Sequence, residues 1–284
     1  MTTQVNPPVV VGVDGSESAR AAVRWAAAEA ASHGAPLHLV YVIGAPLDYG
    51  PGLGVVPIDY ETFRKAGDEA IADAAKSAEE AAAVKVSAFV VGGNPTTVLL
   101  ERSREARLIV VGTRGLGAVK RGVLGSVSTA VSRRAHCPVA VIPDQAEHTA
   151  GAVVVGVDGT EADSPAVAIA FDEASHRDAE LVVLHVWTMD GILSTATLRT
   201  EAYALLSESM AGYRERYPEV RMRRTVVENS PVKRLVEASD TAQLVVVGTH
   251  NPGLVAELIF GSTSQAVAHR THCPVIIAKA PEAA

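Results

Sequence analysis

The segment Val9-Val-Val-Gly-Val-Asp14-Gly-Ser16 recurs almost unchanged as Val153-Val-Val-Gly-Val-Asp158-Gly-Thr160, and this recurrence is the main indication of the fold. Near the end of each copy, His136-Cys-Pro-Val139 recurs as His272-Cys-Pro-Val275. Self-similarity at this period indicates one structural unit used twice. The sequence therefore predicts two tandem domains.

The offset between the copies places the domain boundaries. It is 144 positions at Asp14 and Asp158 but 136 positions at His136 and His272, so the second copy is shorter. We assign the missing residues to the Pro- and Gly-rich segment 44–60, and the polar stretch 143–151 indicates a linker. The predicted domains are residues 1–143 and 152–284.

Each copy alternates short β-branched runs with long Ala-rich segments of helical period. The runs are Val9–Val13, Leu37–Ile43, Val86–Val91, Leu108–Val111 and Val139–Ile142, then Val153–Val157, Leu181–Trp187, Met222–Val227, Leu244–Val247 and Val275–Ala278. They are almost continuously apolar, as in strands buried on both faces. Between the first two runs, the segment 17–33 has the pattern of an amphipathic helix with Ser16 as its N-cap and Gly34 at its end.

Strand, helix and strand in this order predict parallel strands with right-handed crossovers. The predicted fold class is α/β, with two tandem Rossmann-like open parallel five-stranded sheets of strand order 3-2-1-4-5 and helices on both faces.

Composition restricts the class of protein. The formal net charge is −7, and the chain has only 4 Phe, 2 Trp and 6 Tyr, which argues against a nucleic-acid partner. Cys137 and Cys273 are too far apart in sequence for a CxxC pair, and two cysteines make no disulfide framework. No signal-like N-terminus and no apolar window of about 18 residues is present. We expect a cytoplasmic protein with no membrane segment.

The chemistry is expected beyond the carboxyl ends of the strands, where strand order reverses. Asp14 follows the first strand, Gly112-Thr-Arg-Gly115 follows the fourth, and Gly125-Ser126 opens the last helix. Glycines let backbone N–H groups approach an anion, and a helix start favours phosphate. Ser126 and Ser128 could add hydroxyl donors. The sequence also places five basic residues and no acidic one between Thr113 and Arg134, namely Arg114, Lys120, Arg121, Arg133 and Arg134.

Plainer interpretations of the same residues exist. Asp14 alone could form an Asx-turn or cap the first helix, and the glycines alone could serve a turn and close packing. Their joint position at the strand ends favours a phosphate site, with Asp14 accepting from a ribose hydroxyl or an adenine amino group.

The spacing matches neither a Walker A loop nor GxGxxG. Gly112-x2-Gly115-x9-Gly125-Ser126 instead resembles the universal stress protein family, whose nucleotide-binding members carry Gly-x2-Gly-x9-Gly-Ser/Thr. The resemblance covers the whole chain as a tandem pair. It implies that ATP binds, with Mg²⁺ carried by its phosphates, in a role in bacterial stress adaptation or persistence. It also implies residue roles: Val13 and Asp14 at adenine or ribose, Val42 at the base, and Gly112, Arg114, Gly115, Gly125, Ser126, Val127 and Ser128 at the phosphates.

The same resemblance implies an assembly. The last strands of the two domains, Val139–Ile142 and Val275–Ala278, are expected to pair in an internal pseudo-dimer. A homodimer of chains and an unidentified regulatory protein partner are further expectations.

The second copy carries a degenerate version of the motif. Its equivalent residues are Val157, Asp158, Gly248, Gly261, Ser262, Thr263 and Ser264. However, His250 replaces Arg114 and Asn251 replaces Gly115, and Pro252 follows. Asparagine crowds the turn, and proline removes an amide donor. We expect weaker nucleotide binding at this site.

Three functions remain open from the sequence: a regulatory nucleotide binder, an enzyme (a slow ATPase or a phosphoryl or adenylyl transferase), and an interaction module that holds no ligand. No residue pattern supplies a base or a Walker-type aspartate, which favours binding over turnover. The adjacent His136 and Cys137 make a poor catalytic dyad, and no catalytic residue is assigned. His33, His38, His148, His176 and His185 lack metal-ligand spacing, so no protein-ligated metal is expected.

Overall fold

The computed structural model describes residues 6–44, 60–115, 124–144, 150–158, 164–187, 210–228, 230–249 and 262–279. The described residues form two compact units. The first holds residues 6–115 and 125–137, and the second holds Leu124 and residues 138–279, within the described ranges. Each unit is an α/β structure, as predicted.

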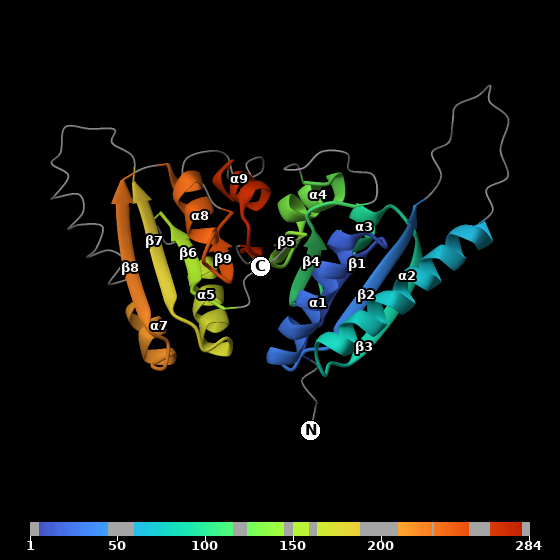
Figure 1. Cartoon of the computed structure of the whole chain (residues 1–284), viewed down its shortest axis with the longest axis horizontal. Helices are drawn as coiled ribbons and strands as arrows, with labels where there is room; N and C mark the ends of the chain where they lie inside the picture. The colour runs from blue at the N-terminus through green and yellow to red at the C-terminus, as the bar shows by residue number, and fades with distance from the viewer. Residues whose placement is uncertain are drawn as a thin grey trace. The chain divides into compact units, whose positions relative to one another are not determined.

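The first unit alternates strands with helices (Figure 1). Its elements are β1 (Val9–Val13), α1 (Glu17–Ser32), β2 (Leu37–Gly44), α2 (Tyr60–Ala81), β3 (Val86–Gly93), α3 (Pro95–Arg102), β4 (Leu108–Gly112) and α4 (Ser126–Arg134). Its strands lie in the order β3-β2-β1-β4 and are all parallel, with Val9 opposite both Leu37 and Leu108. Helices α1 and α2 pack together on one face, and α3 packs with α4 on the other. The reversal of strand order between β1 and β4 is the feature that positions the site.

The second unit repeats this plan and adds one strand from the first copy. Its elements are β5 (Val139–Ile142), β6 (Val153–Val157), α5 (Ser164–His176), β7 (Leu181–Trp187), α7 (Ala211–Arg216), β8 (Met222–Glu228), α8 (Pro231–Ser239), β9 (Leu244–Val247), α9 (Ser262–Arg270) and β10 (Val275–Ile277). The strand order is β5-β10-β9-β6-β7-β8, in which β8-β7-β6-β9-β10 is the predicted 3-2-1-4-5 order.

Strand β5 pairs antiparallel with β10, with Val139 opposite Ile277. This pairing confirms the expectation that the last strands of the two copies associate. It also assigns β5 to the second compact unit, although β5 ends the first copy in sequence. The predicted domain boundary at residue 143 marks the end of the first sequence copy, and it stays a prediction.

Helix α1 forms as its sequence indicates. Ser16 is the N-cap, and its hydroxyl accepts the N–H of Ala19 at 3.1 Å. The helix buries a stripe of small apolar residues, consisting of Ala19, Ala22, Val23, Ala26, Ala27 and Ala30. Gly34 follows with a φ of +59°, a left-handed conformation that glycine adopts without strain. Small side chains on the buried face let α1 lie close to the sheet.

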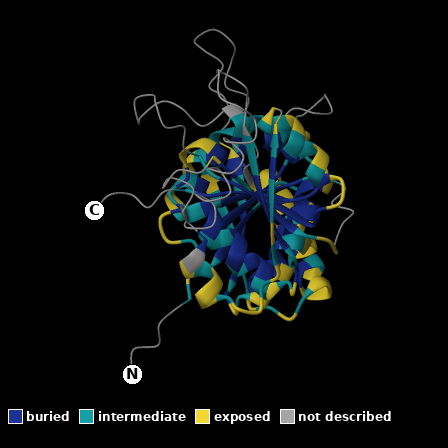
Figure 2. Cartoon of the chain, turned by 90° about the vertical axis from the view of Figure 1, so that its left-hand side faces the viewer, coloured by how far each residue is buried: buried dark blue, intermediate teal, exposed yellow. Residues whose placement is uncertain are grey.

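Burial of the strands differs from the prediction at the edges. All residues of β4 and β5 are buried, and Figure 2 shows burial concentrated on strands and inner helix faces. In contrast, most residues of β3 and β8 are half-buried or exposed. Continuous burial was therefore wrong for these two strands, because each pairs with one neighbour only among the described strands. No helix within the described ranges has both the length and the apolar character needed to cross a bilayer.

Candidate nucleotide site

The residues expected at the strand ends come together in the first unit. Asp14 follows β1 directly, and the glycine loop, residues 112–115, follows the neighbouring β4. An added Cβ atom on Gly115 would overlap Oδ2 of Asp14, so the loop backbone packs directly against this carboxylate. The N–H of Ser16 donates to Oδ1 of Asp14 at 3.0 Å. Asp14 thus forms the expected Asx-turn and also faces the glycine loop.

The start of α4 lies beside the same loop. The N–H of Gly125 donates to the carbonyl of Thr113 at 2.8 Å, and an added Cβ on Gly125 would lie 3.8 Å from the nitrogen of Gly115. Gly125 is the N-cap of α4 and, being glycine, supplies no side-chain acceptor for the helix. The first-turn N–H groups of a helix carry partial positive charge and bind anions. The loop and the helix start therefore form a cradle suited to a phosphate.

Ser126 and Ser128 of α4 differ in burial and in hydrogen bonding. Ser126 is exposed, whereas Ser128 is buried and its hydroxyl donates to the carbonyl of Gly112 at 2.7 Å. This bond holds α4 to the end of β4. Because the hydroxyl proton of Ser128 is already engaged, we expect Ser128 to meet an anion through its backbone N–H. Val127 between them is half-buried.

The residues expected at the base lie on neighbouring strands. Val13 is the buried last residue of β1, and the half-buried Val42 lies on β2, one position beyond Tyr41, the partner of Val13. The ring of Tyr41 packs under α2, where a Cβ on Gly67 would lie 2.8 Å from it. Val13 and Val42 are thus at the same end of the sheet as Asp14.

The expected positive patch is smaller than the sequence count suggested. Arg114 lies in the glycine loop, but Arg133 and Arg134 are exposed in the last turn of α4. At about 1.5 Å per residue, this turn is ~10 Å or more from the helix start. The two arginines complement the negative helix end rather than the phosphate cradle. Lys120 and Arg121 lie outside the described residues.

Ser18 is a residue of the site that sequence reasoning missed. It is 4% exposed in the first turn of α1, and its hydroxyl accepts the N–H of Arg114 at 3.3 Å. Its Oγ also lies 3.5 Å from Oγ1 of Thr113. A Cβ on Gly112 would lie 2.8 Å from the carbonyl of Ser18, so glycine is required where α1 crosses β4. The adjacency of β1 and β4 was the signal that could have identified this contact.

The second unit keeps part of the arrangement. The hydroxyl of Ser264 donates to the carbonyl of Gly248, as Ser128 does to Gly112. Val157 is buried, Asp158 is exposed, and Thr263 lies in the first turn of α9. Ser262 begins α9, but its side chain, Gly261 and residues 250–252 fall outside the described part.

His185 is a further residue that the sequence did not place. It lies opposite Val157 on β7, and its Nδ1 is 3.2 Å from the Val157 carbonyl. Burial lowers the pKa of His185 below its ordinary value, while the bond to Val157 and the Asp158 carboxylate oppose that shift. In the second unit, the neutral imidazole of His185, which donates to the carbonyl of Val157, thus occupies the position that Tyr41 occupies in the first unit. The strand register brings it beside the second set of expected residues.

The repeated His-Cys-Pro segments have a structural role. The N–H of His136 donates to the hydroxyl of Ser103 at 3.0 Å, and the N–H of His272 donates to Ser239 at 3.2 Å. Burial raises the pKa of the Cys273 thiol to about 12. A thiol held in its protonated form is a poor nucleophile, which gives a physical reason to assign Cys273 no catalytic role.

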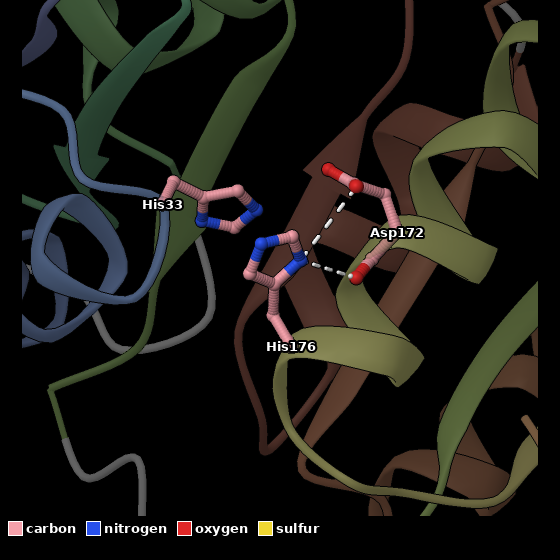
Figure 3. A group of neighbouring side chains, drawn as sticks. All are labelled: His33, Asp172 and His176. Atoms are coloured by element: carbon pink, nitrogen blue, oxygen red, sulfur yellow. Dashed lines mark hydrogen bonds and ion pairs between the residues drawn. The ribbon is translucent and has the colours of Figure 1, made fainter. Parts of the chain in front are cut away.

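The remaining histidines that the sequence raised have local partners. His176 lies beside Asp172 on α5, with Nδ1 2.9 Å from the Asp172 carbonyl and 3.6 Å from Oδ1 (Figure 3). Nδ1 of His33 is 3.0 Å from the carbonyl of Glu29, and His38 makes an edge contact with Phe89 at 5.2 Å between ring centroids. His148 lies outside the described residues. The expectation of no protein-ligated metal stays a prediction.

The fold and this cradle define a class of protein, the doubly wound α/β proteins whose ligands bind at a topological switch point. The sequence profile of the universal stress protein family matches residues 6–143 and 150–279. The chain belongs to the universal stress protein family, in a tandem form with two family domains.

Similar proteins support the assignment. A universal stress protein of Mycobacterium tuberculosis is 40% identical over 293 aligned positions, which cover 95% of this chain and 96% of the relative. A second one from that species is 39% identical over 285 positions, with the same two coverages. Among solved structures, a universal stress protein from Archaeoglobus fulgidus superposes with a TM-score of 0.72 at 20% identity and 97% coverage of both chains. This last similarity bears on the fold alone.

Proposed function

We propose that this protein binds ATP between the ends of β1 and β4 and acts as a regulatory nucleotide binder in bacterial stress adaptation. The observation that carries the proposal is the start of α4, where Gly125 supplies no capping side chain and lies beside the glycine loop that packs on Asp14. Family membership supports the regulatory role.

Each part of a nucleotide has a suitable group in this crevice. The α4 amides and the loop suit the polyphosphate, with Mg²⁺ carried on its oxygens. Asp14 suits a ribose hydroxyl or the adenine amino group, because a carboxylate accepts hydrogen bonds from both. Val13 and Val42 supply apolar surface for the base. The arrangement supports binding of the whole nucleotide and needs no covalent step.

The decisive test is Gly125→Asp. A Cβ at residue 125 would make only ordinary contacts, the closest at 3.7 Å, and the backbone there has φ −60° and ψ 157°, which suits an aspartate N-cap. The new carboxylate would occupy the place proposed for phosphate. We expect ATP affinity to fall by at least 100-fold by calorimetry, while the melting temperature stays equal or rises. An unchanged affinity would show that the phosphates bind elsewhere.

Gly212→Asp is the charge-matched control. Gly212 is exposed on α7, and a Cβ added there would have no described atom within 4 Å, so the same charge is introduced without a steric conflict. ATP affinity should stay within about twofold of wild type. Wild-type protein should bind one or two ATP per chain and release nucleotide on heat denaturation, detectable by anion-exchange chromatography. No ATP in either measurement would overturn the proposal.

The two cysteines bear on where in the cell the protein acts. Cys137 and Cys273 are both buried and are not joined in a disulfide, which is compatible with the reducing cytoplasm that we propose as the protein's location. We further propose that chains associate as a homodimer and that a regulatory protein partner reads the bound state. Sedimentation of the protein with and without ATP tests the first of these.

A further inference from the structure

We infer that Ser18 is a positioning residue of the first nucleotide site, one that holds the glycine loop in its phosphate-binding shape without touching the nucleotide. This inference rests on the proposed function. It concerns a residue on α1, outside the glycine motif and outside the set expected from family resemblance.

The contacts of Ser18 fix the loop at two successive residues. Its buried Oγ accepts the N–H of Arg114 at 3.3 Å and lies 3.5 Å from Oγ1 of Thr113. The Ser18 backbone also packs on Gly112, where no Cβ could fit. The end of β4 and the first half of the loop are therefore tied to the first turn of α1.

The hydrogen bond between Ser18 and Arg114 sets the direction of the backbone N–H groups in the glycine loop. Because the N–H of Arg114 points to Ser18, it is not directed at a ligand, and the next amide along the loop belongs to Gly115. Gly115 lies against Asp14 and beside Gly125, at the cradle. Ser18 thus orients Gly115 toward the phosphates and leaves Arg114 to act through its guanidinium.

The second copy lacks this hydroxyl in its sequence. At the offset that relates Asp14 to Asp158, Ser18 corresponds to Ala162. Alanine cannot accept a hydrogen bond through its side chain, so we expect the second loop to lack an equivalent tie. This difference adds to the replacement of Gly115 by Asn251 as a cause of unequal sites.

The matched comparison is Ser18→Ala against Ser103→Ala. Ser103 is as buried as Ser18, and its hydroxyl likewise accepts a backbone N–H from another element, that of His136 after α4. However, Ser103 lies at the end of α3, away from the cradle. Both variants lose the same kind of bond, so both should lose similar stability. Only Ser18→Ala should lower ATP affinity, by about tenfold, the size expected for one misplaced hydrogen bond.

Adenosine separates positioning from general damage. It lacks phosphates, so Ser18→Ala should leave its affinity within about twofold of wild type. Equal losses for ATP and adenosine, or no loss of ATP affinity, would overturn the inference while the proposed function stands. Wild-type protein that binds neither would overturn both.

Hydrogen exchange tests the same point in wild-type protein. The amide of Arg114 should be protected before ATP is added and should gain little afterwards, whereas the amide of Gly115 should gain protection on binding. Rapid exchange at Arg114 in the ligand-free protein would refute the tie to Ser18, whatever the variants do.

Discussion

Asp14 and Asp158 show how the same residue type acquires different surroundings in two copies of one unit. Asp14 is half-buried, bonded to Ser16 and packed against Gly115, whereas Asp158 is exposed. In the second loop, Asn251 replaces Gly115, and the following residue, Pro252, has no amide donor. The first site should therefore hold ATP more tightly.

The prediction is that Asp14→Ala removes most of the tight ATP binding, at least a tenfold loss, while Asp158→Ala changes it by less than about threefold. A carboxylate that accepts a ligand hydroxyl contributes roughly 1.5–3 kcal/mol. Calorimetric titration at low salt measures both variants. The reverse ranking would contradict the proposed difference between the sites.

Cys273 gives a second prediction at the residue scale. Burial raises its pKa from 9.0 to about 12, so its thiol is protonated in the folded protein at a pH where the unfolded chain ionises. The protonated Cys273 thiol therefore contributes to the free energy of unfolding. This contribution is complete below about pH 9 and is lost as the pH rises toward 12. Cys273→Ala should therefore lose less stability than wild type between pH 8 and 10.5 in urea titrations. Parallel curves for the two proteins would show that the thiol ionises normally.

At the scale of elements, one buried serine in each copy joins the end of a helix to the segment that leads into the last strand of that copy. The Ser103 hydroxyl donates to the Leu100 carbonyl at 2.6 Å and accepts the His136 N–H, and Ser239 does the same between Val236 and His272. One side chain thus closes a helix and anchors the entrance to a strand in each copy. The two copies therefore share this pair of bonds at equivalent positions.

Ser103→Ala should lower the free energy of unfolding by about 1–3 kcal/mol, because it leaves the N–H of His136 without its acceptor. Ser32→Ala is the control, since the Ser32 hydroxyl donates to the Glu29 carbonyl within α1 and joins no second element through that bond. That substitution should change stability by no more than ~0.5 kcal/mol. Urea unfolding followed by circular dichroism measures both. Similar losses of unfolding free energy in the two variants would mean that the bond from Ser103 to His136 adds no stability beyond that of a bond within one helix.

At the scale of the whole molecule, the chain is expected to hold nucleotide rather than turn it over. Asp14, the carboxylate at the glycine loop, is engaged with the Ser16 amide, which suits an acceptor better than a catalytic base. Steady-state ATP hydrolysis should be slower than about one per second, the lower end of typical enzymes. A faster rate that Asp14→Ala abolished would instead support the ATPase alternative.

The repeat, the strands and the residues at the strand ends could be predicted from the amino-acid sequence. Most strand bounds agree within one or two residues, because buried parallel strands are short, apolar runs that local composition identifies. The glycine spacing likewise predicted the loop after β4 and the start of α4. Asp14 was recognised from its place after β1, and the structure shows both its turn bond and its contact with the loop.

Which of these residues are in contact could be read only from the folded chain. Ser18 joined the site because β1 and β4 are neighbours, which brings the first turn of α1 over Gly112. Arg133 and Arg134 do not belong to the candidate site, because they lie in the last turn of α4 and the site is at its first turn. The exposure of β3 and β8 followed from their places at sheet edges, and β5 entered the second unit through β10. These outcomes depend on contacts between segments far apart in sequence, which local periodicity does not encode.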